Sequence, residues 1–290
     1  MKPSTQAQRS VTFILQPQIQ TIAPRPRRGR STLNMEKKVY ETFNSDEVTD
    51  EMLEEASKLF SENYGVWGEH AAQLMGKFAK AGSRVRLSKE RLRNEYLPSG
   101  ISSYVRVSVN GHLAGNAFSC RWSVDGRTIC WITQLVVHRA YRERGLAVGL
   151  LNETRLDGND IYGLMSSHPA ACLAALKAFG HSFNTVSLEF MKKYAESIMK
   201  VSPVTYVRDA KLRGSLFDSK DTNGLVSSVD TGFFVDHEEP LEALALVRES
   251  MEWPLGELLD GHEFILILQA RRRSRSRSSS APSGTSLTET

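Results

Sequence analysis

The sequence lacks any run of apolar residues that reaches the 18 or so positions needed to cross a bilayer, so it predicts no membrane-spanning segment. Cysteine is scarce as well. Cys120, Cys130 and Cys172 are the three in 290 residues, and they form no C-x-x-C pair. Because each lies inside an apolar segment, we expect reduced core thiols of an intracellular protein and no metal site.

Two widespread phosphate-binding motifs are missing too. The chain contains neither G-x-x-x-x-G-K-[ST] nor G-x-G-x-x-G, which excludes a Walker loop and the dinucleotide-binding fingerprint.

Residues 1–34 hold six basic residues and no acid, and residues 270–290 hold five arginines and one glutamate. The net charge of +4 therefore belongs to the two ends, and the body between them, near −6, favours the approach of cationic substrates.

The two ends have the composition of disordered tails. Residues 1–34 are basic and rich in Gln, Ser and Pro, which is compatible with a mitochondrial transit peptide, with a plain tail, or with a start site at Met35. Residues 270–290 include RRRSRSRSSS, which is either a solvated end, a nuclear localisation signal or an Arg/Ser patch for nucleic acid. We expect a cytoplasmic or nuclear protein, with mitochondrial import left open.

Apolar patterning predicts a folded core over residues 35–200 and an extension over residues 201–269 that completes its sheet. Asn110-Gly111 between two alternating segments is a strong hairpin signal. Strands are expected at 37–43, 104–109, 113–122, 131–137, 161–165, 229–235 and 262–269. Helices are expected near 52–60, 88–97, 146–154, 169–179, 188–199 and 239–253.

The stretch from Cys130 to Leu156 contains the most specific pattern. An apolar strand runs into a basic loop, and Gly145 and Ala147 then open a helix. Backbone N–H groups at a helix N-terminus are unpaired and partly positive, so this turn predicts an anion site, most naturally for phosphate. The strand at 161–165 should follow in parallel, which would locate a ligand at the carboxyl ends of both strands.

Leu135-x-Val137 followed by Arg142-x-x-Gly145-x-Ala147 resembles the acetyl-CoA-binding motif of the GNAT superfamily of N-acetyltransferases. In that family [RQ]-x-x-G-x-[GA] follows a strand ending L-x-V. The order of expected elements over residues 36–190 is similar as well. The resemblance implies an α/β acyl-CoA N-acyltransferase fold: a mixed, mostly antiparallel sheet with splayed central parallel strands, flanked by helices. It also implies acetyl-CoA as co-substrate and direct transfer to an amine in a ternary complex.

The same resemblance assigns binding residues. An aromatic loop with Tyr64 and Trp67 would lie over the acceptor amine. The cofactor would be bound by the central strand and the loop after it, at Leu135, Val136, Val137, Arg142, Glu143, Arg144, Gly145, Leu146, Ala147 and Val148. Backbone N–H groups would hold the pyrophosphate, and the arginines would add positive charge.

The acid and base usual in the family are missing. Members often have a glutamate on the central strand and a tyrosine on the later helix, whereas this strand offers Gln134 and the helix has Leu176 in that region. Gln134 could orient a water but cannot take a proton. His168 and Tyr162 are the nearest substitutes, although a helix cap explains His168 equally well and a core position explains Tyr162.

Three functions therefore stay open. The first is an N-acetyltransferase for an amine-bearing small molecule or peptide. The second is a module that binds acetyl-CoA without turnover, as a sensor or interaction partner. The third is a nucleic-acid-associated protein that binds through its Arg/Ser tail, with a salt-dependent affinity. A polyamine, an amino sugar, a peptide N-terminus and a protein lysine all remain candidate acceptors, because a fold does not determine its substrate.

Overall fold

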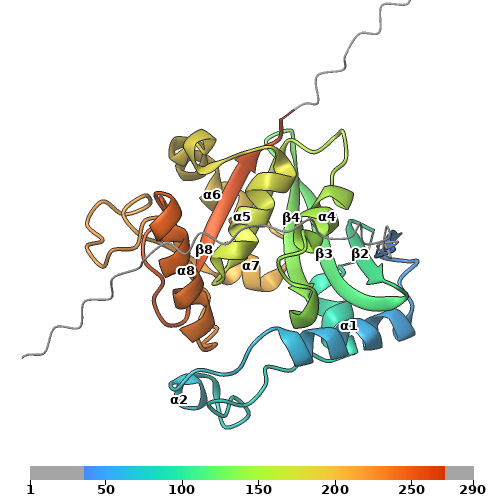
Figure 1. Ribbon diagram of the computed structural model, residues 1–290. Helices are drawn as coiled ribbons and strands as arrows, with labels where there is room; N and C mark the ends of the chain where they lie inside the picture. The colour runs from blue at the N-terminus through green and yellow to red at the C-terminus, as the bar shows by residue number, and fades with distance from the viewer. Residues whose placement is uncertain (1–35, 99, 272–290) are drawn as a thin grey trace, which may run out of the picture. The chain divides into compact units, whose positions relative to one another are not determined.

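The computed structural model describes residues 36–98 and 100–271. They form a mixed eight-stranded sheet of order β1-β2-β3-β4-β5-β8-β7-β6 (Figure 1). Among these strands, β4 and β5 pair in parallel and the other neighbours pair antiparallel. The strands are β1 Lys38–Asn44, β2 Ser102–Val109, β3 His112–Val124, β4 Arg127–Val137, β5 Ile161–Ser166, β6 Lys211–Arg213, β7 Ser228–Asp230 and β8 His262–Gln269. The α/β class and the mostly antiparallel sheet are as predicted.

Eight α-helices occur in the described ranges. A π-helical turn, Leu92–Tyr96, directly follows the third of them, within the segment predicted as one helix at 88–97. The helices are α1 Asp50–Asn63, α2 Ala71–Met75, α3 Lys89–Arg91, α4 Leu146–Glu153, α5 Pro169–Phe179, α6 Leu188–Lys200, α7 Thr205–Asp209 and α8 Glu238–Ser250. None of them is both long and apolar enough to span a membrane.

Local sequence explains the elements around the centre of the sheet. Asn110 and Gly111 take φ of 51° and 84°, which gives the two-residue turn that joins β2 to β3. Asp125 and Gly126 take φ of 48° and 72° and join β3 to β4 in the same way. This second turn was not predicted from the sequence. Helix α4 then connects β4 to β5 as a parallel crossover, as predicted.

Helices cover both faces of the sheet. Contacts of residues in β3 show which helices lie on which face. The guanidinium of Arg121 donates to the carbonyl of Thr154 at the end of α4, at 2.9 Å. The next side chain points to the other face, where the indole of Trp122 donates to the carbonyl of Ile198 in α6, at 3.2 Å. Phe118 shares the face of Trp122 and packs in one cluster with residues of α1. Helix α4 therefore lies on one face, and α1 and α6 lie on the other.

The chain after residue 200 enters the same sheet. β8 pairs with β5 from the pair Ile161–Gln269 to the pair Ser166–Phe264, and it separates β5 from β7. The predicted strand at 229–235 was wrong beyond Asp230: β7 ends there, and Gly232 follows at φ 63°. Val235 instead forms an isolated bridge with Trp67. The tails predicted at 1–34 and 270–290 lie outside the described residues, apart from residues 270 and 271.

Candidate active site

The centre of the site is a change in pairing between β4 and β5. Their parallel ladder runs from Ile129–Ile161 to Ile132–Leu164 and ends there, whereas β4 continues to Val137 and β5 to Ser166. The register between β3 and β4 also shifts at this point, because Phe118 faces Gln134 and Ser119 faces Ile132, which leaves Thr133 as a bulge. Bulges re-aim side chains and end pairing, and they are common beside active sites.

Gly145 is the N-cap of α4 and has a φ of 77°, in the left-handed region that favours glycine. Glu143, two residues earlier, also has a positive φ, of 63°. A Cβ added at Gly145 would meet no atom within 4 Å, so the space in front of this helix end is open. An open turn at a helix N-terminus suits an anionic group such as a pyrophosphate. Figure 1 shows α4 beside β3 and β4.

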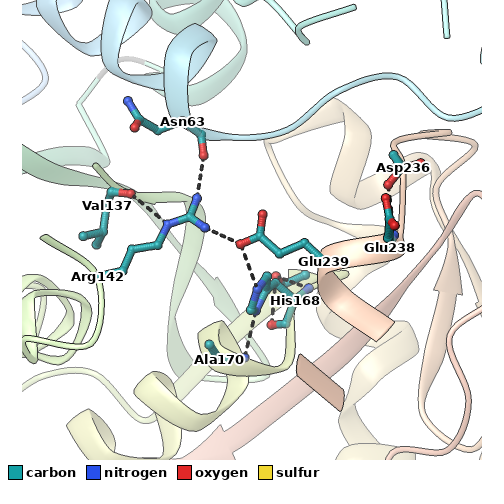
Figure 2. A network of polar contacts seen from close by, with 9 residues as sticks. Asn63, Val137, Arg142, His168, Ala170, Asp236, Glu238 and Glu239 are labelled. Carbon is teal, nitrogen blue, oxygen red and sulfur yellow. Dashed lines mark hydrogen bonds and ion pairs between the residues drawn. The ribbon is translucent and has the colours of Figure 1, made fainter. Parts of the chain in front are cut away.

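Two of the three arginines in the loop after β4, Arg142 and Arg144, have carboxylate partners. The guanidinium of Arg142 forms an ion pair with Glu239 of α8 and donates to the carbonyls of Asn63, at 2.7 Å, and Val137, at 3.4 Å (Figure 2). Arg144 pairs with Glu36 at 2.8 Å. Arg142 thus connects the end of α1 and the start of α8 to the loop, a connection that the motif did not suggest.

His168 caps α5. Its Nδ1 accepts a 3.2 Å hydrogen bond from the N–H of Ala170, which confirms the cap interpretation. Its Nε2 lies 3.6 Å from Glu239, on the side of Arg142 (Figure 2). Burial lowers the pKa of His168, and the nearby Glu239 carboxylate partly opposes that shift. The ring is therefore neutral at pH 7, with Nδ1 engaged in the cap.

Gln134 and Thr133 are buried polar groups at the bulge. Gln134 is 6% exposed, and within residues 36–98 and 100–271 neither atom of its side-chain amide has a hydrogen-bond partner; the hydroxyl of Thr133 has none there either. Unpaired buried polar groups are costly and call for a water or a ligand. The role of Gln134 in orienting a water stays a prediction.

Tyr162 lies on the opposite face of the sheet from Gln134. Its ring stacks on Phe179 of α5 at 3.9 Å, and its hydroxyl accepts from Asn159. The structure therefore brings Gln134 to the α1 side of the bulge and Tyr162 into the core beneath α5, and it does not bring the two together.

Tyr64 and Trp67 lie in the loop after α1, packed against a segment of the C-terminal extension. The Trp67 ring meets Phe233 edge-on at 5.3 Å, and the Tyr64 ring is 6.1 Å from the same ring. Trp67 is 6% exposed, whereas Tyr64 keeps part of its surface open. Of the two, Tyr64 is the one that a small acceptor could touch without rearrangement.

Two functional candidates were missed in the sequence. Tyr206 of α7 donates a 2.6 Å hydrogen bond to the carbonyl of Thr133, and its ring lies 5.5 Å from that of Tyr96. Glu263 of β8 is 8% exposed. Burial is the main cause of the raised pKa values of Tyr64, Tyr96 and Tyr206, and the carboxylate of Glu263 raises each further. No motif marks these positions, because the chain folds them together from four distant segments.

These three tyrosines define what we call the tyrosine recess. Each is enclosed enough for burial to dominate its pKa, yet each keeps partly exposed surface. Tyr64 stacks on Phe60 of α1, and Tyr206 contacts both Tyr96 and the bulge at Thr133. The three rings therefore lie on the α1 side of the sheet.

No protein-family model matches the chain, and no protein of curated function matches its sequence. Several acetyltransferases are among the solved structures similar to it. A glucosamine N-acetyltransferase region of a fungal multi-domain β-N-acetylglucosaminidase is 13% identical over 47% of this chain and 14% of that chain, with a TM-score of 0.35. An aminoglycoside acetyltransferase from an uncultured soil sample, in complex with sisomicin, is 11% identical over 52% and 93%, with a TM-score of 0.34. An acetyltransferase of the GNAT family from Streptococcus pneumoniae is 14% identical over 48% and 81%, with a TM-score of 0.32.

Proposed function

We propose that this chain is an N-acetyltransferase that moves an acetyl group from acetyl-CoA to an amine by direct transfer in a ternary complex. The observation that carries the proposal is the arrangement around β4: a strand whose parallel ladder stops at a bulge, followed by an open helix N-terminus with Gly145 at φ 77°. The motif Arg142-x-x-Gly145-x-Ala147 occupies that same turn.

In this proposal β4 and β5 splay apart beyond the pair Ile132–Leu164, and the pantetheine arm lies between them. Backbone groups of Leu135 and Val137 bind the arm, and the N–H groups from Arg142 to Val148 hold the pyrophosphate. The co-substrate supplies an activated acetyl thioester. An N–H of β4 polarises its carbonyl, which stabilises the oxyanion that forms during transfer.

The acceptor amine approaches the acetyl group from the side opposite the co-substrate, and it enters through the tyrosine recess. Gln134 orients a water beside the bulge, because its amide is buried and has no partner within the described residues. His168 acts on the leaving sulfur only through Nε2, since Nδ1 is used in the cap of α5. Tyr162 supports the fold beneath α5.

A second function, binding of acetyl-CoA without turnover, is favoured by one observation: Glu239 already occupies the guanidinium of Arg142. A catalytically silent sensor would show the same donor site. Calorimetry with acetyl-CoA, together with thiol release in the presence of primary amines, separates the two. Binding with thiol release supports the enzyme, binding alone supports the sensor, and failure to bind contradicts both.

A further inference from the structure

Glu263 is a buried acidic residue, and burial is unusual for an acidic side chain with a purely structural role. It lies on β8 one residue beyond the pair Phe264–Ser166, and therefore at the carboxyl end of β5. Ligands of parallel strand pairs bind at such carboxyl ends. Its side chain is almost fully buried. The hydroxyl of Thr231, which lies 3.4 Å from the carbonyl of Gly261, favours the ionised form of Glu263 and so lowers its pKa.

The register between β8 and β5 shows to which face of the sheet the side chain of Glu263 points. Glu263 and Ile267 alternate onto one face, and Ile267 pairs with Gly163, where an added Cβ would meet the ring of Trp131. Trp131 pairs with Cys120, which shares its face with Phe118, the partner of Gln134. Glu263 and Gln134 therefore lie on the same face of the sheet, the face that carries the tyrosine recess.

Among the residues that the structure describes, no basic side chain forms an ion pair with Glu263. The titratable side chains that sense it come from four elements: Tyr64 after α1, Tyr96 in the π-helical turn, Tyr206 in α7 and Cys172 in α5. Burial raises the pKa of each, so all four are neutral at pH 7. Burial also raises the pKa of Glu263 to about 7, and the Thr231 hydroxyl limits that rise. A group that titrates near the working pH is suited to proton transfer.

We propose that Glu263 is the general base for the acceptor, and that the tyrosine recess selects a protonated primary amine. The inference rests on the acetyl transfer proposed above. A cationic ammonium group is attracted by a buried carboxylate and by the faces of aromatic rings. The tyrosine recess contains three aromatic rings, and the carboxylate of Glu263 is near enough to raise the pKa of each of their hydroxyls.

Glu263 takes one proton from the ammonium group, and the nitrogen lone pair then forms a C–N bond to the thioester carbonyl carbon. The C–S bond breaks and the sulfur leaves with its electron pair. The second proton of the nitrogen goes to that thiolate, so the products are an acetamide and CoA thiol. Glu263 finally releases its proton to solvent.

The test compares two amines of different basicity. Wild type and Glu263→Gln receive acetyl-CoA with a primary alkylamine, which is protonated near neutral pH, or with aniline, which is neutral there. We expect Glu263→Gln to bind acetyl-CoA as wild type does, to lose about a hundredfold in turnover of the alkylamine, and to lose only a few fold with aniline. The acidic limb of the wild-type pH–rate profile near pH 7 should disappear.

A second variant keeps the proposal testable if Glu263→Gln folds poorly. Thr231→Val removes the hydroxyl that stabilises the carboxylate, so the pKa of Glu263 should rise and the acidic limb should move to higher pH. Glu249→Gln, an exposed position on α8, is the matched control and should behave as wild type. A purely structural Glu263 would leave the limb unmoved in both test variants.

Three results overturn the inference, and they differ from one another. If wild type acetylates the alkylamine and Glu263→Gln keeps its rate and pH profile, Glu263 is not the base although the transfer is real. If wild type acetylates neither amine, the acetyl transfer itself is contradicted, and the role of Glu263 with it. Equal losses with both amines at unchanged acetyl-CoA affinity would likewise contradict proton removal by Glu263.

Discussion

The hydroxyl of Tyr206 donates a 2.6 Å hydrogen bond to the carbonyl of Thr133, the bulged residue of β4. The bond joins α7, which follows the predicted core, to the strand at the centre of the motif. Thr133 directly follows Ile132, whose pair with Leu164 is the last one between β4 and β5. The site of the proposed chemistry is therefore completed by residues beyond position 200.

Tyr206→Phe should weaken both stability and turnover. The change leaves the carbonyl of Thr133 without its partner, which costs about 1 kcal/mol for a hydrogen bond of this kind. A less firmly held bulge should lower turnover about tenfold, or about 1.4 kcal/mol in activation free energy. Urea unfolding and steady-state rates measure the two effects. Tyr194→Phe, on α6, serves as control, and a Tyr206→Phe protein equal to it in both assays would contradict the assignment.

Gly145 offers a matched pair for the pyrophosphate site. Asn and Asp tolerate the left-handed backbone conformation about equally, so Gly145→Asn and Gly145→Asp should lose similar stability, about 1 kcal/mol. Only the aspartate adds a negative charge at the open helix end. We expect calorimetry to show acetyl-CoA affinity within a few fold of wild type for the asparagine variant and at least a hundredfold weaker for the aspartate variant. Equal affinities would mean that no anion binds at this turn.

His168 can be tested in both of its roles. His168→Ala should lose about 1 kcal/mol because the cap to Ala170 disappears, whereas His168→Asn keeps a capping side chain and should lose less. If Nε2 also assists the leaving thiolate, both variants should lose turnover about tenfold per folded molecule. Unchanged turnover in both would restrict His168 to capping.

The pH dependence of the same variants has a defined sign. The pKa of His168 is lowered in the folded protein, so below the ordinary histidine value near 6.5 the unfolded state binds the extra proton. The contribution of His168 to stability is therefore complete above that pH and is lost as the pH falls through it. His168→Asn should flatten this part of the curve of unfolding free energy against pH.

Glu263 should lower stability at neutral and alkaline pH. Its pKa is raised to about 7 from an ordinary 4.5, so the folded state binds the proton more tightly, and stability falls as the pH rises from 4.5 to 7. The loss amounts to about 3 kcal/mol once the carboxylate is ionised. Glu263→Gln should thus be more stable than wild type at pH 8 and equal to it at pH 4.5, by denaturant unfolding at both. A variant less stable than wild type at pH 8 would contradict this account.

Much of the structure of residues 36–190 could be predicted because the signals there are local. Asn110-Gly111 defines its hairpin through positive φ, and Pro169 with Gly180 bounds α5, whose ends were as predicted. The strand at 229–235 was overestimated because β propensity alone does not show that Gly232 turns the chain toward the loop of Trp67.

The sequence predicted only those features of the site that lie within one short segment of the chain. Gly145 is such a case, since the loop and the helix that it caps are consecutive. The partners of Arg142, by contrast, come from α1 and α8, almost a hundred residues away in the case of Glu239. Glu263 appeared in the sequence as one acid in an ordinary strand, and only the register between β5 and β8 aligns it with the end of β5.

The most direct measurement of the central claim follows a labelled acetyl group. The protein is incubated with acetyl-CoA carrying carbon-13 in the acetyl group and with a mixture of primary amines, and the products are identified by mass spectrometry. The account predicts a labelled acetamide of at least one amine, formed in proportion to free CoA, and its loss in Gly145→Asp. Binding of acetyl-CoA by wild type with no labelled acetamide above the enzyme-free reaction would contradict it.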